Sequence, residues 1–147
     1  MSRPHARYLI LAAVASAVAL GSISGCTRRP SNRAIDPSNE LPFGVVDGPT
    51  EGASVGLVSS AGGWAVDDRG VREVRVYVDG RFINSSPLNT PRPDVAKVYP
   101  QYMRGTNVMG WTLAIEFPSP GPHTILVQAV DTDGATRDIG TIKVDVK

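Results

Sequence analysis

The chain has 147 residues, and its 15 Lys and Arg residues nearly balance its 14 Asp and Glu residues. This length is enough for one domain of ordinary size, with too little left over for a second. The balanced charge gives no electrostatic basis for binding nucleic acid, and the single cysteine excludes an intramolecular disulfide.

The first 25 residues have the parts of a cleavable export signal. Arg3 and Arg7 form a short basic segment, an apolar run follows over residues 8–20, and mostly small residues fill positions 21–25. The apolar run is shorter than the roughly 20 residues that a membrane-spanning helix needs. We therefore predict that residues 1–25 are removed during export, which leaves 13 basic and 14 acidic residues, a formal charge of −1.

The only cysteine follows this segment directly. The stretch Ile23-Ser24-Gly25-Cys26 resembles the lipobox of bacterial lipoproteins, and this resemblance implies that Cys26 becomes the lipid-bearing first residue of the mature protein. An unmodified cysteine after an ordinary signal peptide is the alternative. Each buried methylene of an acyl chain such as palmitate adds about 0.8 kcal/mol of membrane affinity, so two or more chains anchor a protein stably without spanning the bilayer.

The residue after the cysteine bears on the compartment. The resemblance implies that an aspartate at this position would retain the protein in the inner membrane of a Gram-negative cell, and Thr27 stands there instead. We therefore expect the periplasmic or surface face of the outer membrane in a Gram-negative host. In any other host we expect the outer face of the cell membrane.

Residues 26–41 are predicted to be the lipidated cysteine and a flexible tether. The segment holds prolines and small polar residues and almost nothing apolar, a composition typical of a solvated linker. Arg28, Arg29 and Arg33 lie close to the anchored end, where each basic side chain gains roughly 1 kcal/mol near anionic lipid. They are equally compatible with a purely solvated linker.

Residues 42–147 are predicted to be all-β. Short alternating runs separated by Gly, Pro, Asn and Asp are typical of a sandwich or barrel. In residues 73–78 Val74, Val76 and Val78 share one face, and Asp79-Gly80 supplies a tight hairpin turn. Later runs repeat the alternation, with inward positions predicted at Trp111, Leu113, Ile115, Phe117, Ile125, Val127, Ala129, Ile142, Val144 and Val146.

Three stretches, GWAVDD at 63–68, VRVYVDG at 74–80 and GPHTILVQAVD at 121–131, together resemble bacterial Ig-like domains. This resemblance implies one antiparallel β-sandwich of about seven strands that acts as a non-catalytic spacer or binding module. Because the chain lacks the cysteine pair of antibody domains, we expect apolar packing to supply the stability, with Trp64 as an interior anchor.

A long excursion separates two of these strands. Residues 85–109 exceed the usual length of a connection, which makes them a candidate functional segment. Residues 93–99 are predicted to form a short helix capped by Asp94 and stopped by Pro100. The Arg-Pro-Asp-Val and Tyr-Pro runs resemble an insert found in other bacterial Ig-like domains, which suggests a recurrent structural element.

Two hypotheses describe this excursion. Tyr and Arg are frequent binding hot spots, so the candidate binding surface comprises Arg92, Tyr99, Tyr102 and Arg104. Alternatively, the tyrosines fold back as a lid on the sandwich, because the excursion also carries apolar residues that favour burial: Val95, Val98, Met103 and Met109.

Acidic residues at two loops raise the possibility of calcium. The candidate ligands are Asp67, Asp68, Asp131 and Asp133. Calcium needs about six to eight oxygen ligands, and these loops would have to meet at one end of the sandwich to supply them. Asp and Gly are also ordinary turn residues, so we expect turns here and no bound metal.

Catalysis is not expected. His123 is the one histidine outside the export signal, which excludes a histidine-based zinc cluster, and no nucleophile-elbow motif surrounds any serine. We expect the His123 ring to cover a sheet edge. The predicted function is a membrane-anchored, non-catalytic module without a cofactor that binds another envelope protein. Binding of glycan or peptidoglycan through the aromatic excursion is the alternative.

Overall fold

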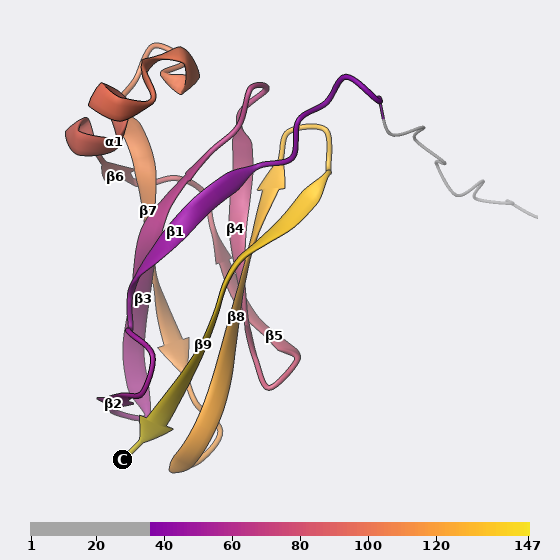
Figure 1. Cartoon of the computed structure of the whole chain (residues 1–147). Helices are drawn as coiled ribbons and strands as arrows, with labels where there is room; N and C mark the ends of the chain where they lie inside the picture. The colour runs from indigo at the N-terminus through magenta and orange to yellow at the C-terminus, as the bar shows by residue number, and fades with distance from the viewer. Residues whose placement is uncertain (1–35) are drawn as a thin grey trace, which may run out of the picture. The chain divides into compact units, whose positions relative to one another are not determined.

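A computed structural model of the chain describes residues 36–147, which form a two-layered β-sandwich (Figure 1). The export signal, the lipobox and Cys26 lie outside the described residues. The elements in order are β1 Phe43–Gly48, β2 Ala53–Val55, β3 Val58–Val66, β4 Val71–Val78, β5 Arg81–Ser86, β6 Thr90–Pro91, α1 Pro93–Val98, the 3₁₀ helix η1 Pro100–Tyr102, β7 Val108–Glu116, β8 Gly121–Asp131 and β9 Thr136–Val146.

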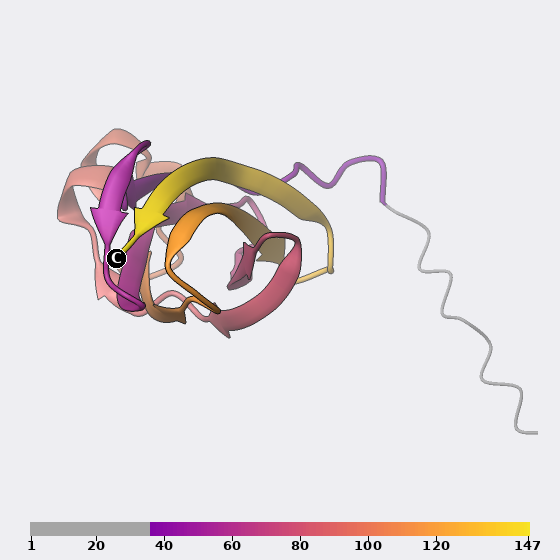
Figure 2. The same ribbon diagram turned by 90° about the horizontal axis from the view of Figure 1, so that it is seen from below.

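The strand order is that of an Ig-like sandwich, as predicted. Sheet A has the order β1-β3-β7-β6, and sheet B has the order β2-β9-β8-β4-β5. With the strands lettered along the chain, these are the A-B-E-D and G-F-C sheets of the immunoglobulin architecture, with β5 added beside strand C. Figure 2 shows from below how β8 and β9 curve round together.

Two short edge strands raise the number of strands above the seven expected. β2 has three residues and β6 has two, too few to produce a visible alternation in the sequence. β2 also departs from the antiparallel prediction, since it pairs with β9 in parallel. The chain passes from β1 in sheet A to β2 in sheet B, where β2 extends the edge beside β9.

The alternation predicted for the long strands is confirmed by burial. Val74, Val76 and Val78 of β4 lie in the core at 0–2% exposure. The predicted inward positions of β7, β8 and β9 are all buried with them. The hairpin between β4 and β5 is also as predicted, because Asp79 and Gly80 both have positive φ, at 49° and 77°.

The interior tryptophan is Trp111, and the prediction for Trp64 was wrong. Trp111 is 1% exposed in the core, whereas Trp64 is half-buried. The inward positions of β3 are Ala61 and Ala65, so alternation turns Trp64 to the outer face of sheet A, the face that points away from sheet B. The size of the indole suggested burial, but its position in the strand decides its side.

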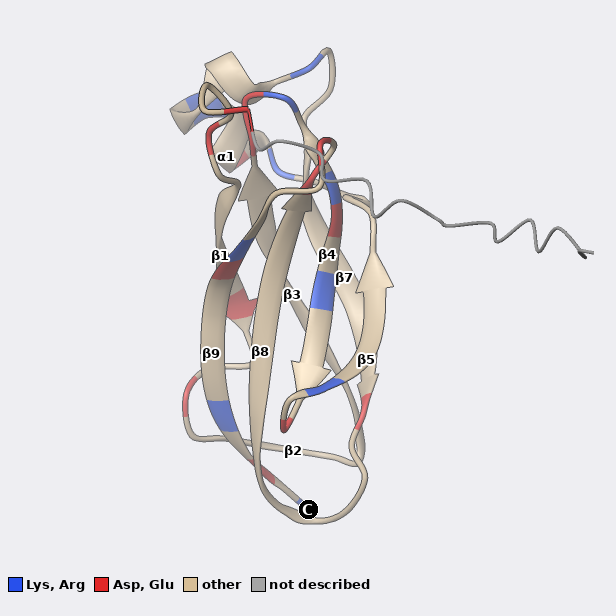
Figure 3. Cartoon of the chain, turned by 90° about the vertical axis from the view of Figure 1, so that its right-hand side faces the viewer, with Lys and Arg blue, Asp and Glu red and all other residues tan. Residues whose placement is uncertain are grey.

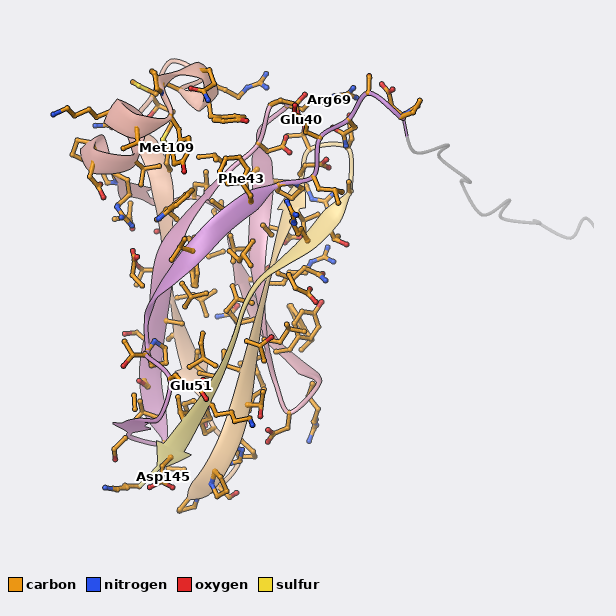
Figure 4. All side chains as sticks on the ribbon, in the orientation of Figure 1. Glu40, Phe43, Glu51, Arg69, Met109 and Asp145 are labelled. Atoms are coloured by element: carbon orange, nitrogen blue, oxygen red, sulfur yellow. The ribbon has the colours of Figure 1, made fainter. Side chains whose placement is uncertain are left out.

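The folded domain begins before residue 42, which corrects the predicted end of the tether. Asn39 donates a hydrogen bond of 2.6 Å to Asp131, and Asp36 pairs with Arg69 at 2.8 Å. Residues 36–41 therefore lie along the sandwich, and Figure 4 shows Glu40 and Arg69 together at its upper end. These polar residues are held by charge and hydrogen bonding, which the search for apolar periodicity does not detect.

Candidate functional site

The helix of the excursion is positioned by its ends. Pro93 occupies the first turn of α1, where its missing N–H costs nothing. The N-cap residue is Arg92, and no side chain caps the helix, so the prediction that Asp94 is the cap was wrong. Asp94 lies in the first turn and accepts hydrogen bonds from Arg92, which lower the pKa of its carboxyl group to about 2.

Four aromatic rings join the excursion to the outer face of sheet A. The Tyr99 ring lies 5.5 Å from the rings of Phe43 and Trp64, and the Tyr102 ring lies 5.4 Å from that of Phe43. These contacts include the edge-to-face geometry that aromatic pairs prefer. Together with the buried residues beneath them the rings form what we call the lid cluster: Phe43, Trp64, Val66, Val95, Ala96, Tyr99, Tyr102 and Met109.

The lid cluster makes the excursion a second, smaller core. Val95 and Met109 are 4% and 3% exposed beneath the tyrosines, so their predicted burial is confirmed. Val98 and Met103 remain 66% and 40% exposed, against expectation, because Val98 lies on the outside of α1 and Met103 lies just after η1. The excursion thus packs on the sheet as a lid, with Val98 and Met103 on its outer surface.

Arg92 lies across sheet A instead of projecting freely. Its guanidinium group donates to Asp47 at 2.6 Å and to Asp94 at 2.7 Å, and hydrogen bonding to Asp94 is the largest influence raising its pKa. A Cβ atom at Gly110 would come within 2.8 Å of the Arg92 Cγ. Glycine at this position of β7 therefore lets the arginine lie flat over the sheet and reach β1.

A groove of about 460 Å³ opens on the outer face of sheet A beside Arg92. Most of the residues that line it have small side chains. The full lining is Asp47, Gly48, Pro49, Ser60, Ala61, Gly62, Gly63, Thr90, Arg92, Trp111 and Thr112. Hydroxyl groups from β3, β6 and β7 line the same groove as the Asp47 carboxylate and the Arg92 guanidinium group. Sequence reasoning missed every residue of this groove except Arg92, and the only signal was the outward alternation of small polar residues.

The other arginine and tyrosine of the predicted surface line a smaller pocket of about 160 Å³. The Arg104 guanidinium group donates to the Asp68 backbone carbonyl at 3.0 Å. The Tyr102 hydroxyl group lies 3.5 Å from Glu40, and partial burial is the largest influence raising its pKa. The four predicted residues therefore do not form one surface, because Arg92 borders the groove and Tyr99 packs in the lid cluster.

The acidic loops do meet at one end of the sandwich, and Figure 3 shows acidic and basic residues gathered there. Arg69 bridges Asp36 and Asp133 at 2.8 Å and 2.6 Å, an arrangement that we call the N-terminal latch. Asp67 accepts the amides of its own turn, and burial is the main cause of its raised pKa. Asp131 accepts from Asn39 and from the Ala135 amide.

These contacts use most of the candidate calcium ligands within the protein. Among residues 36–147 no three His, Cys, Asp or Glu side chains converge in a way that could hold a metal ion. Over the same residues no helix combines the length and the apolar composition needed to cross a bilayer.

His123 is almost buried and joins three segments. Its Nδ1 lies 2.6 Å from the Asp79 carboxylate and its Nε2 lies 2.9 Å from the Ser119 carbonyl. A catalytic triad needs a hydroxyl nucleophile at the nitrogen opposite the carboxylate, and here a main-chain carbonyl holds that position. The ring also packs 5.6 Å from that of Phe117, so His123 fastens the lower end of the sandwich.

Comparison with known proteins gives similarity in structure alone. No protein-family model matches the chain, and none of the curated proteins matches it. Solved structures with a similar fold include fibronectin(III)-like modules of Clostridium thermocellum CbhA, which are 21% identical with a TM-score of 0.49. That match covers 73% of this chain and 47% of the other chain, so this chain spans about half of the length of the CbhA structure that it matches.

Two further structures are similar at lower scores. Dimeric latent PorU from Porphyromonas gingivalis is 16% identical with a TM-score of 0.47, over 75% of this chain and 11% of that one. The PKD domain of an M14-like peptidase from a Thermoplasmatales archaeon is 17% identical with a TM-score of 0.43, over 74% and 98% of the two chains. The assignment of an Ig-like sandwich therefore depends on the strand order described above.

Proposed function

We propose that the protein is a non-catalytic lipoprotein, anchored through Cys26, whose Ig-like domain binds another protein of the cell envelope. The observation that carries the binding role is the groove on the outer face of sheet A. Its hydroxyl groups and its ion pair offer donors and acceptors to an extended chain, and the small lining residues allow that chain to lie close to the sheet.

A protein partner fits this groove better than a glycan. Sugar rings bind through exposed aromatic faces, but Trp64 and Tyr99 pack against each other in the lid cluster, with ring centres 5.5 Å apart. Trp111, the aromatic residue of the lining, is 1% exposed. What remains accessible is a set of hydrogen-bonding groups suited to a peptide backbone and its polar side chains.

A photo-crosslinking residue placed at Thr112 tests the proposal in living cells. Thr112 is exposed on β7 within the groove, so replacing it leaves the core intact. Thr141 is the matched control, an exposed threonine on β9 opposite Leu126 in sheet B. We expect irradiation to yield a discrete crosslinked product from position 112 and none from position 141.

The outcomes separate the two ligand classes. Equal crosslinking from both positions, or none from either, contradicts the proposed groove. Retention of the purified domain on peptidoglycan that Thr112→Arg abolishes and Thr141→Arg does not would show that the groove binds glycan instead of protein. Retention that neither variant affects would support the alternative of glycan binding through the aromatic excursion.

A further inference from the structure

The outer surface of the excursion differs in charge from the rest of the domain. Residues 92–108 contain three basic residues and one acidic residue, whereas the other residues between 36 and 147 contain 7 basic and 13 acidic residues. The outside of α1 and the turn that follows η1 expose two basic and two apolar side chains, which we call the tip: Lys97, Val98, Met103 and Arg104. Basic and apolar side chains side by side are typical of surfaces that rest on anionic lipid.

The acidic residues near the tip are paired with arginines outside it. Asp36 and Asp133 are held by Arg69 in the N-terminal latch, and Asp68 lies 3.8 Å from the same guanidinium group. Asp94, the acidic residue of the excursion itself, is paired with Arg92. Lys97 and Arg104 are exposed on the tip. Arg104 donates one of its five N–H groups to the Asp68 carbonyl, so both side chains keep donors for an external anion.

The N-terminal latch brings the chain to the same end as the tip. Glu40 reaches the Tyr102 hydroxyl group of η1, and Asp36 is fixed to Arg69; Figure 1 shows both segments at the upper end of the sandwich. Nine residues, 27–35, separate Cys26 from Asp36 of the latch. The ten steps between their Cα atoms span at most about 36 Å when fully extended, so a lipid on Cys26 would keep this end near the bilayer.

We propose that the tip rests on the headgroup region of the anionic bilayer that holds lipidated Cys26. This inference depends on the lipid anchor of the proposed function. The anchor raises the local concentration of lipid at the tip. Two apolar side chains and two basic groups are therefore sufficient to hold the tip on the bilayer. The sheet A groove, which lies on the side of the sandwich, stays accessible to a partner in this orientation.

Site-directed spin labelling measures the orientation directly. Cys26 is the only cysteine and its thiol is consumed by the lipid, so a cysteine introduced elsewhere is labelled uniquely. The labelled positions are Val98→Cys at the tip and Val58→Cys at the opposite end, 66% and 73% exposed. The lipidated protein is reconstituted in vesicles of phosphatidylethanolamine and phosphatidylglycerol, and each label is exposed to lipid-soluble oxygen and to a water-soluble nickel complex.

We expect the ratio of oxygen to nickel accessibility to be several-fold higher at position 98 than at position 58. Lys97→Glu, alone or with Arg104→Glu, should lower the ratio at position 98 to that at position 58. The control, Arg137→Glu with Lys143→Glu on β9, should leave it unchanged. Vesicles of phosphatidylcholine should give the same loss as the tip variants.

The contrary results distinguish the two proposals. Equal ratios at positions 98 and 58 in protein that floats with the vesicles overturn the orientation and leave the anchor standing. Protein that does not float at all overturns the anchor and the orientation with it. An unchanged ratio after charge reversal at the tip also contradicts the electrostatic contact.

Discussion

At the scale of single residues, His123 has the most constrained chemistry in the domain. The Asp79 carboxylate and the Ser119 carbonyl are both acceptors, so both hydrogen bonds form only when each ring nitrogen carries a proton. The hydrogen bond to Asp79 is the main influence that raises the pKa of His123 above 6.5. The amide of Thr124 is the main influence that lowers the pKa of Asp79, followed by His123.

These shifts predict how stability depends on pH. Because the pKa of His123 is raised on folding, its contribution to the free energy of unfolding is fully present below about pH 6.5, the unfolded pKa. That contribution is lost as pH rises through the folded pKa. The lowered pKa of Asp79 makes its contribution complete above about pH 3.8 and lost as pH falls through its folded pKa. We expect the pair to stabilise the domain most between these two unfolded values.

Proton NMR titration of protein that lacks residues 1–25 tests the predicted pKa of His123 directly, because His123 is then the sole histidine. We expect the imidazole protons to titrate above pH 6.5, and Asp79→Asn to lower that midpoint. A midpoint at or below 6.5 in the wild type would falsify the charged pair.

At the scale of elements, α1 is stable only because of the lid cluster. It has six residues, too few to form a helix alone in water. We expect Tyr99→Ala, which removes the ring packed on Trp64 and Phe43, to lower the free energy of unfolding by about 2 kcal/mol, since the ring is half-buried. Urea denaturation followed by circular dichroism measures the change.

Tyr102→Phe is the matched control for this experiment. It keeps the ring in the lid cluster and removes a hydroxyl group whose contact with Glu40 is 3.5 Å long, so the free energy of unfolding should change by less than about 0.5 kcal/mol. A stable, fully folded Tyr99→Ala variant would instead favour the predicted role of Tyr99 in ligand binding.

The elements that the sequence predicted are those with one buried face. β4, β7, β8 and β9 alternate apolar and polar residues over their length, and period-2 patterning detects such strands. β3 is harder to orient because its inward positions include Ala61 and Ala65, which carry little apolar signal. The large indole of Trp64 therefore led to the prediction that this residue points inward.

The alternation of residues in the sequence could not predict the groove, for a related reason. Ser60, Thr90 and Thr112 come from three strands and are brought together only by the pairing of β3 and β6 with β7. Each is an unremarkable polar residue in the sequence. The two tyrosines of the excursion were candidates for ligand binding because of their residue type, although their contacts place them in the lid cluster.

At the scale of the whole molecule, the proposal depends first on the lipid at Cys26. We expect radiolabelled fatty acid to be incorporated into the wild-type protein and not into Cys26→Ser, because the proposal makes the Cys26 thiol the site of attachment. Thr27→Ser is a suitable control, since it leaves the lipobox and the cysteine in place. Equal labelling of the wild type and Cys26→Ser would remove the anchor.

The latch and Lys147 lie at opposite ends of the sandwich (Figure 1). β8 alone has 11 residues, and a strand rises about 3.3 Å per residue, so the two ends are roughly 36 Å apart. If the latch end faces the bilayer, as proposed, any polypeptide joined after Lys147 would begin one domain length farther from the bilayer than the latch. The domain would then act as a spacer that sets the height above the bilayer at which such a polypeptide is displayed.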